Sequence, residues 1–162
     1  MIVVGVDGSE SARAALGFGL EEAARRSARV RVVTAFRSPE YWPVAYGMAS
    51  GMVVLPSIEQ LAEDAQRTAR QTLTEVVGRG GAAVPVEVRV AQGHPATLLL
   101  DQAAQAELLV VGHRGLGAVA SVCLGSVGLQ CVLHAVCPVV VVPPVPRPTV
   151  RGATAVASEA QA

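Results

Sequence analysis

Val110-Val111-Gly112-His113-Arg114-Gly115-Leu116 and, further on, Leu124-Gly125-Ser126-Val127 form the stretch around which the chain is organised. The apolar run 108–111 predicts a buried strand, and two glycines then interrupt it. A third glycine and a serine precede residues 127–135, which we predict to be helical. Glycine lets a ligand approach main-chain N–H groups closely, and a helix start adds free N–H donors and the positive end of the helix dipole. This layout is typical of a site that binds an anion.

The beginning of the chain predicts a second strand–turn–helix unit. Residues 2–6 form a short apolar run, and Asp7-Gly8-Ser9 follows it as a turn and a helix start. Apolar residues at helical spacing from Ala12 to Ala23 predict an amphipathic helix, and residues 30–35 predict the next strand. A crossover of this length between two strands indicates that they pair in parallel.

The middle of the chain predicts two more helices and one strand. Periodicity fails over residues 36–56, which carry four of the five aromatic residues, and a loop of this length is usually functional or mobile. The loop could close over a bound base, contact a partner protein or pack against the helix that follows it.

Ser57 and Gln60 resemble a capping box for that helix, which ends near Gly78. Alternation over residues 84–90 predicts a strand with one wet face, placed at a sheet edge by Pro85, and a third helix begins near His94 and Pro95 and extends to residue 106.

The end of the chain predicts an edge strand and a tail. Cys137-Pro138 precedes four consecutive valines, residues 139–142, which we predict to be the last strand. At a sheet edge these valines would expose apolar faces and unpaired backbone groups unless another chain covered them. We therefore predict a homodimer through residues 138–143. Residues 144–162 are rich in proline, alanine, serine and threonine and predict a disordered tail.

Composition limits the class of protein. A chain of 162 residues predicts a single domain, and its longest apolar runs fall well short of the roughly 20 residues that span a bilayer. The first residues lack a basic region and a long apolar run, so we expect a cytoplasmic protein without a signal peptide. Thirteen basic residues balance thirteen acidic ones, which disfavours nucleic acid as a partner. The sequence contains no lysine, so a P-loop of the Walker type is excluded.

The spacing G-x2-G-x9-G-S of Gly112, Gly115, Gly125 and Ser126, together with residues 4–9 and Cys137-Pro138, resembles the universal stress protein family, specifically its ATP-binding branch. The resemblance covers residues 1–143, which we expect to form the domain. The order βαβαβαβαβ favours an α/β fold with a doubly wound parallel sheet. The resemblance implies five strands in the order 3-2-1-4-5 with helices on both faces, the Rossmann-like fold of the adenine nucleotide alpha hydrolases. Ligands of such sheets bind where the strand order changes direction, which would bring Asp7 beside Gly112.

The resemblance also implies ATP as the ligand, with Mg²⁺ or Mn²⁺. Gly112 looks like the glycine on the ribose side, and the residues from Gly115 and Gly125 to Val127 look like the phosphate cradle. Asp7 looks like the acidic residue near adenine and ribose and could help to hold the cation; alternatively, Asp7 only caps a helix together with Ser9, and the glycines only make a tight turn. The predicted site consists of Gly5, Asp7, Ala35, Val111, Gly112, Arg114, Gly115, Gly125, Ser126 and Val127.

Other residues with reactive side chains give weaker signals. His94, His113 and His134 lack the spacing of metal ligands, so a zinc site is not predicted. The cysteines, Cys123, Cys131 and Cys137, are odd in number, two of them lie on an apolar predicted helix, and the expected compartment is reducing, so buried thiols are favoured over metal ligands or a disulfide.

The leading hypothesis is a cytoplasmic ATP-binding protein that acts as a nucleotide-dependent switch or sensor in the stress response. Asp7 is the only acid near the predicted site, so no general base is evident, and we expect at most slow ATP hydrolysis or autophosphorylation. Two alternatives remain. One is a homodimeric interaction protein that needs no nucleotide. The other is an enzyme that adenylates a substrate, for which a chain of 162 residues leaves little room.

Overall fold

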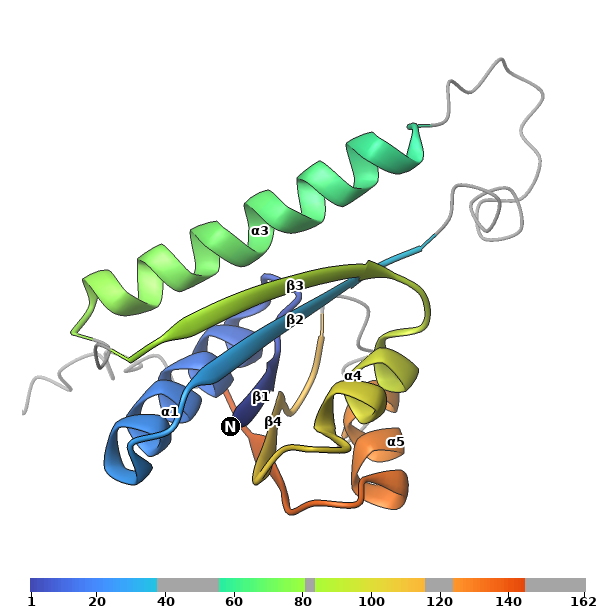
Figure 1. The fold of residues 1–162 in the computed structure, drawn as a ribbon. Helices are drawn as coiled ribbons and strands as arrows, with labels where there is room; N and C mark the ends of the chain where they lie inside the picture. The colour runs from blue at the N-terminus through green and yellow to red at the C-terminus, as the bar shows by residue number, and fades with distance from the viewer. Residues whose placement is uncertain (38–55, 81–83, 116–123, 145–162) are drawn as a thin grey trace, which may run out of the picture.

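Over the residues that the structure describes, five strands and four helices alternate. The computed structural model describes residues 1–37, 56–80, 84–115 and 124–144. Phe36 ends the second strand, whereas the other aromatic residues of the 36–56 loop, Cys123 and the tail from residue 145 onward lie outside these residues. The elements run in the order β1 (Ile2–Gly5), α1 (Glu10–Arg26), β2 (Val30–Phe36), α3 (Ile58–Gly78), β3 (Val86–Gln92), α4 (Pro95–Ala103), β4 (Leu108–Gly112), α5 (Ser126–His134) and β5 (Val139–Val142) (Figure 1).

The strands form one parallel sheet in the order β3-β2-β1-β4-β5. Central strand β1 pairs in parallel with both β2 and β4, so Ile2 lies opposite Val30 on one side and Leu108 on the other. The outer strands β3 and β5 pair in parallel with β2 and β4. The predicted strand order and parallel pairing are thereby confirmed.

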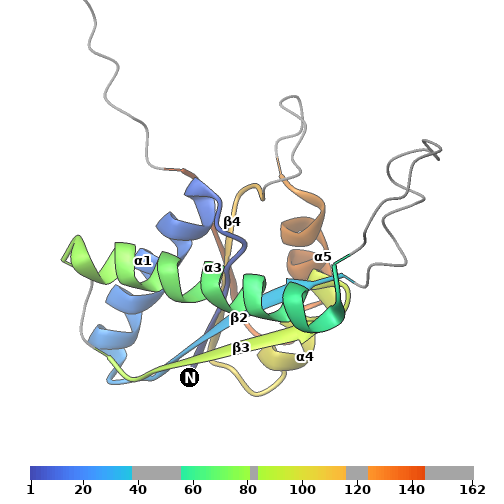
Figure 2. The same ribbon diagram turned by 90° about the horizontal axis from the view of Figure 1, so that it is seen from above.

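Alternate residues of each strand pack on opposite faces of the sheet. Ile2 and Val4 belong to an apolar cluster with residues of α1 and α3, whereas Val3 belongs to a second cluster with residues of α4 and α5. Figures 1 and 2 show that α3 covers β2 and β3 while α4 and α5 lie together beyond the opposite face. Helices on both faces explain why the central strands β1 and β4 are almost wholly apolar.

Helix α1 packs against β1 at a glycine, Gly19. A Cβ placed on Gly19 would stand 2.6 Å from Val4 Cγ2 of β1. A Cβ on Gly17, which faces α3 instead, would stand 3.8 Å from Val76 Cγ1. Glycine inside a helix costs about 1 kcal/mol relative to alanine. At position 19 this cost is offset because the missing side chain lets the helix pack directly on the sheet.

Element ends follow their local chemistry. Ser57 Oγ accepts from Gln60 N at 3.2 Å and Gln60 Oε1 accepts from Ser57 N at 2.8 Å, which confirms the capping box of α3. The strand expected over residues 84–90 is instead Val86–Gln92, since Pro85 has no N–H for the ladder. Helix α4 ends at Ala103, three residues before its expected end.

Over the described residues, no helix combines the length and apolar character needed to cross a membrane.

Candidate functional site

A pocket of about 670 Å³ opens at the carboxyl ends of β1, β2 and β4. It lies where the chain leaves β1 toward α1 on one face of the sheet and leaves β4 toward α5 on the other. This is the place where the strand order changes direction, the usual ligand site of such sheets. All ten residues of the predicted site line it: Gly5, Asp7, Ala35, Val111, Gly112, Arg114, Gly115, Gly125, Ser126 and Val127.

Several lining residues were not predicted from the sequence. Val33 and Arg37 flank Ala35 at the end of β2, and Pro95 and Leu99 of α4 reach the pocket from the next helix. Val33 and Arg37 are each two residues from Ala35, so period-2 alternation along the strand could have suggested them. Leu99 carries no such signal, because only the tertiary packing of α4 brings it to the pocket.

One half of the pocket is apolar and made of small residues. Gly5, Val33, Ala35, Leu99 and Val111 line it. A Cβ on Gly5 would stand 3.1 and 3.2 Å from the two Cδ atoms of Leu99, so the glycine lets Leu99 pack over the end of β1. Such a surface suits a flat apolar group, and it offers few side-chain hydrogen bonds.

The other half of the pocket is the amino terminus of α5. Gly125 is the N-cap, in an extended conformation, and among the described residues no side chain caps the helix. Gly125 N donates to His113 O at 2.9 Å, and Gly125 O accepts from Leu129 N at 2.9 Å, which fixes the loop against the end of β4. The first residues of the helix, Ser126 to Gly128, line the pocket. The first N–H groups of a helix have no partner within it, so an anion would be stabilised here.

The three glycines of the motif have different surroundings. None of Gly112, Gly115 and Gly125 adopts the left-handed conformation, and close approach of neighbouring atoms explains the glycine at positions 112 and 115 only. A Cβ on Gly112 would stand 2.8 Å from the Ser11 carbonyl carbon, and a Cβ on Gly115 would overlap Oδ2 of Asp7. A Cβ on Gly125 would stand 3.5 Å from Arg114 Cα, which is an ordinary contact.

Asp7 lies at the rim of the pocket within a turn built by Ser9. Asp7 Oδ1 accepts from Ser9 N at 3.0 Å, while Ser9 Oγ accepts from Ala12 N at 3.1 Å and is the N-cap of α1. Ser9 Oγ also donates to Arg114 O at 3.4 Å, which links this turn to the glycine loop. The capping role therefore belongs to Ser9, and the carboxylate of Asp7 lies beside Gly115 in the pocket lining.

Arginines dominate the charge of the pocket. Arg114 and Arg37 line it, and Asp7 is the one acid among the described lining residues. Arg114 Nε and His113 Nδ1 are buried and have no hydrogen-bond partner among the described residues. Buried donors are nearly always paired, so the unpartnered Arg114 Nε beside the start of α5 fits an acceptor group on a ligand.

Other candidate ligands and nucleophiles lie outside this arrangement. Among the residues that the structure describes, no three His, Cys, Asp or Glu side chains gather as a metal site. Cys131 and Cys137 are free thiols; burial raises the pKa of Cys131 to about 11 and also raises the pKa of Cys137. Raised pKa values keep both thiols protonated near neutral pH, which makes them poor nucleophiles.

Comparison with known proteins identifies relatives of this chain. The family model described as the universal stress protein family matches residues 1–143. A universal stress protein of Mycobacterium tuberculosis (strain H37Rv) is 31% identical over an alignment of 160 residues, which covers 91% of this chain and 49% of the relative. This chain thus spans about half the length of the curated relatives that it matches.

Two solved structures combine the same fold with a bound nucleotide. A universal stress protein in complex with cAMP is 26% identical with a TM-score of 0.63, and the match covers 89% of this chain and 97% of that one. The universal stress protein from Archaeoglobus fulgidus in complex with dAMP is 25% identical with a TM-score of 0.56, and the match covers 87% and 95%.

Proposed function

The chain belongs to the universal stress protein family, and on this premise we propose that it binds ATP with Mg²⁺ or Mn²⁺ in the pocket between β1 and β4. We propose that the bound nucleotide makes it a switch or sensor in the stress response. The observation that carries the proposal is the amino terminus of α5, which no described side chain caps and which lies beside the unpartnered Arg114 Nε.

The two halves of the pocket suit the two ends of a nucleotide. The apolar half around Ala35 and Leu99 suits adenine, while the α5 amides and Arg114 suit the phosphates. Hydrogen bonds from Arg114 to a phosphate are charge-assisted and would contribute roughly 1.5–3 kcal/mol. The helix dipole adds about 0.3–1 kcal/mol for a nearby negative charge. Asp7 is the lining carboxylate that would help to hold the cation, which binds mainly through phosphates and water.

The ligands of relatives support the nucleotide class. The relatives in complex with cAMP and dAMP carry one adenine and one phosphate group each. ATP adds two phosphates, for which the α5 terminus and Arg114 provide donors. Calorimetric titration with ATP, ADP, AMP, cAMP and GTP, each with and without Mg²⁺, tests the proposal. We expect ATP with Mg²⁺ to bind most tightly; absence of binding to every adenine nucleotide at millimolar concentration would refute it.

Mass spectrometry of small molecules released from the purified protein provides an independent test. We expect the released molecules to include an adenine nucleotide. A protein that releases none and binds none in the titrations leaves the nucleotide-independent alternative.

We propose that turnover of the nucleotide is slow. Asp7 is the one acid among the described lining residues, and its carboxylate already accepts a hydrogen bond from Ser9 N. The proposal places this carboxylate beside the cation, and no second carboxylate is described in the lining that could take a proton from water or a hydroxyl, so efficient hydrolysis lacks an evident catalyst. Single-turnover assays with labelled ATP and Mg²⁺ test this. A rate above about 1 s⁻¹, the low end of ordinary enzymes, would contradict a switch.

The second candidate function is a homodimeric interaction protein that needs no nucleotide. Strand β5 is an edge of the sheet and all four of its valines are half-buried. Helix α5 packs beside it, and this helix and the residues that follow expose four large apolar side chains: Leu129, Val132, Leu133 and Val136. We propose a homodimer through residues 138–143 that also covers this apolar stripe. Light scattering at micromolar concentration tests it, and a monomer would refute it.

The remaining proposals concern the extent and location of the protein. We propose residues 1–143 as the folded domain, residues 144–162 as a tail and the cytoplasm as the location. Limited proteolysis followed by mass spectrometry would cut first after residue 143 if these bounds are right. Fractionation of cells tests the location.

A further inference from the structure

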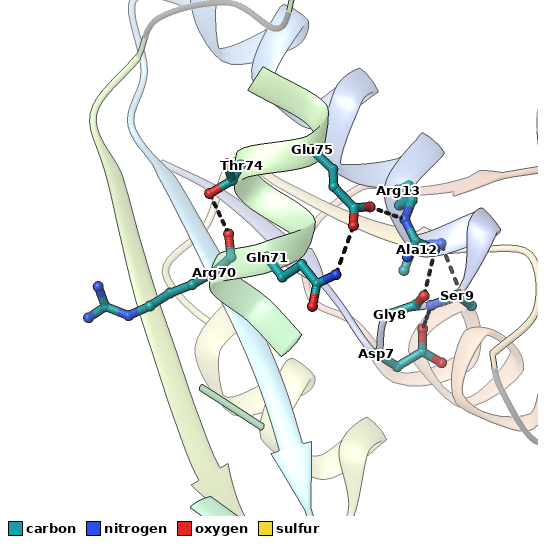
Figure 3. Close-up of polar contacts among 9 residues, drawn as sticks. All are labelled: Asp7, Gly8, Ser9, Ala12, Arg13, Arg70, Gln71, Thr74 and Glu75. Atoms are coloured by element: carbon teal, nitrogen blue, oxygen red, sulfur yellow. Dashed lines mark hydrogen bonds and ion pairs between the residues drawn. The ribbon is translucent and has the colours of Figure 1, made fainter. Parts of the chain in front are cut away.

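The turn that carries Asp7 is held from outside the pocket by α3. Arg13 Nη1 donates to Gly8 O at 2.6 Å, and Arg13 Nε donates to Glu75 Oε2 at 2.7 Å. One guanidinium therefore joins the β1–α1 turn to a helix that is 62 residues further along the chain. Figure 3 shows Glu75 of α3 pointing toward Arg13, with Gly8, Asp7 and Ser9 below the same arginine in this view.

Glu75 is itself held in place. Gln71 Nε2 donates to Glu75 Oε1 at 3.1 Å, so both carboxylate oxygens have a partner. The side chains of Arg13 and Glu75 are 30% and 31% exposed, which is less than for an ordinary surface pair. The hydrogen bond from Arg13 lowers the pKa of Glu75, so the carboxylate is ionised at neutral pH.

A second contact joins the same turn to α3. Gly8 has a φ of +84°, and a Cβ placed on it would stand 2.9 Å from Thr68 Cγ2. Thr68, Gln71 and Glu75 are spaced by three and four residues and therefore lie on one face of the helix. This face of α3 therefore contacts the turn on the side away from the pocket, whereas Asp7 of the same turn lines the pocket.

Helix α3 is the less firmly packed partner in this contact. Three of its 21 residues are buried, namely Ala65, Ala69 and Thr72, whereas seven of the 17 residues of α1 are buried. Elements with few buried residues are displaced at the lowest free-energy cost. A displacement of α3 would release Glu75 from Arg13 and so loosen the turn.

We propose that the Arg13–Glu75 ion pair positions Asp7 for nucleotide binding and thereby couples the packing of α3 to nucleotide affinity. This inference rests on the proposed function. Neither Arg13 nor Glu75 lines the pocket, so both are positioning residues that act through Gly8 and Asp7. Because coupling between two equilibria is reciprocal, a bound nucleotide also strengthens the packing of α3.

The test compares two ion pairs of similar exposure. Arg31 Nη2 lies 2.9 Å from Glu87 Oε2, with side chains 20% and 38% exposed, and this pair joins β2 to β3 outside the pocket lining. We expect Glu75→Ala to raise the Kd for ATP with Mg²⁺ at least fivefold and Glu87→Ala to change it less than twofold. Glu75→Gln keeps an acceptor for Arg13 and should recover most of the affinity. Urea denaturation establishes that each variant is folded.

Amide hydrogen exchange without nucleotide provides the second readout. The Ser9 amide donates to Asp7 Oδ1, so its exchange rate reports whether the turn is intact. We expect faster exchange at Ser9 in Glu75→Ala than in wild type, and no change in Glu87→Ala. In wild type, added ATP should slow the exchange of α3 amides.

The outcomes separate the two proposals. Equal effects of Glu75→Ala and Glu87→Ala on the Kd, or none from either, would overturn the positioning role while leaving nucleotide binding intact. A wild type that binds no nucleotide would refute the proposed function and with it the coupling to affinity. In that case the Ser9 exchange rate still decides whether the ion pair holds the turn, and an unchanged rate in Glu75→Ala would overturn that as well.

Discussion

Asp7 and Gly115 pack so closely that any Cβ on Gly115 would overlap Oδ2 of Asp7. The turn after β1 and the loop after β4 therefore meet across the pocket, and the hydrogen bond from Ser9 Oγ to Arg114 O joins them again. This meeting is possible because β1 and β4 are neighbours in the sheet although they are more than 100 residues apart in the chain. A side chain at position 115 would move Asp7 or the glycine loop.

Gly115→Val should weaken ATP binding at least tenfold, equivalent to about 1.4 kcal/mol. The valine displaces the Asp7 carboxylate and also occupies space in the pocket. Gly78→Val is the matched control, because a Cβ at position 78 meets nothing within 4 Å. Titration calorimetry measures the affinities and light scattering checks that the oligomeric state is unchanged. Equal affinity of wild type and Gly115→Val would count against the proposed site.

Arg114→Ala should weaken binding of ATP about tenfold or more, and binding of AMP less, since the guanidinium would face phosphates. Arg114→Lys should recover only part of the affinity, because an ammonium lacks the planar fork of donors. Arg89→Ala serves as control, since Arg89 is 61% exposed on β3 outside the pocket lining. The result would speak against a phosphate role for Arg114 if the ATP and AMP affinities fell by the same factor.

Gly19→Ala and Gly17→Ala should change stability in opposite directions. A Cβ at position 19 clashes with Val4, so we expect the free energy of unfolding to fall by about 1–2 kcal/mol. At position 17 the Cβ makes only an ordinary contact, so the better helix propensity of alanine should raise it by about 0.5–1 kcal/mol. Urea denaturation measures both. In a Val4→Ala background, which provides room, Gly19→Ala should cost less; an undiminished cost would argue against the clash.

The buried thiol of Cys131 should make stability fall at alkaline pH. Its pKa is raised to about 11 in the folded protein, so the folded state holds the proton more tightly than the unfolded state, whose pKa is near the ordinary value of 9.0. The resulting contribution to stability is fully present below pH 9 and is lost as the pH rises toward 11. Urea midpoints between pH 8 and pH 10.5 measure the effect. The decline should be smaller in Cys131→Ala, and an identical decline would assign it to other groups.

Val136→Arg and Leu133→Arg should disrupt the proposed homodimer without unfolding the protomer. These side chains are 81% and 63% exposed, so arginine costs the isolated fold little but places a charge in an apolar interface. Val77→Arg is the control, because Val77 is 43% exposed on α3, on the other face of the sheet. Sedimentation equilibrium measures the dimer dissociation constant. A dimer that tolerates both changes would not use this apolar stripe.

Local patterns predicted the helices and strands, and resemblance to the family supplied the strand order and the ten predicted residues that line the pocket. Alternating apolar and polar runs mark each element, and the spacing of Gly112, Gly115 and Gly125 marks the loop over the pocket. The remaining features depend on distances across the fold. Leu99 reaches the pocket only through the packing of α4 on the sheet, and Arg13 meets Glu75 only through the packing of α3 on α1. Neither contact produces a periodic pattern in the sequence. The close approach of Gly112 to Ser11 could not be predicted from the sequence either, because it depends on how α1 packs beside β4.

In the proposed site, the start of α5 would offer the nucleotide its peptide groups, which no described side chain caps. Recognition of this kind is encoded in the path of the polypeptide, so amino-acid identity at positions 126 and 127 can drift while the chemistry presented to the ligand stays constant. Counting identical residues among homologues would then understate how much of the function two of them share.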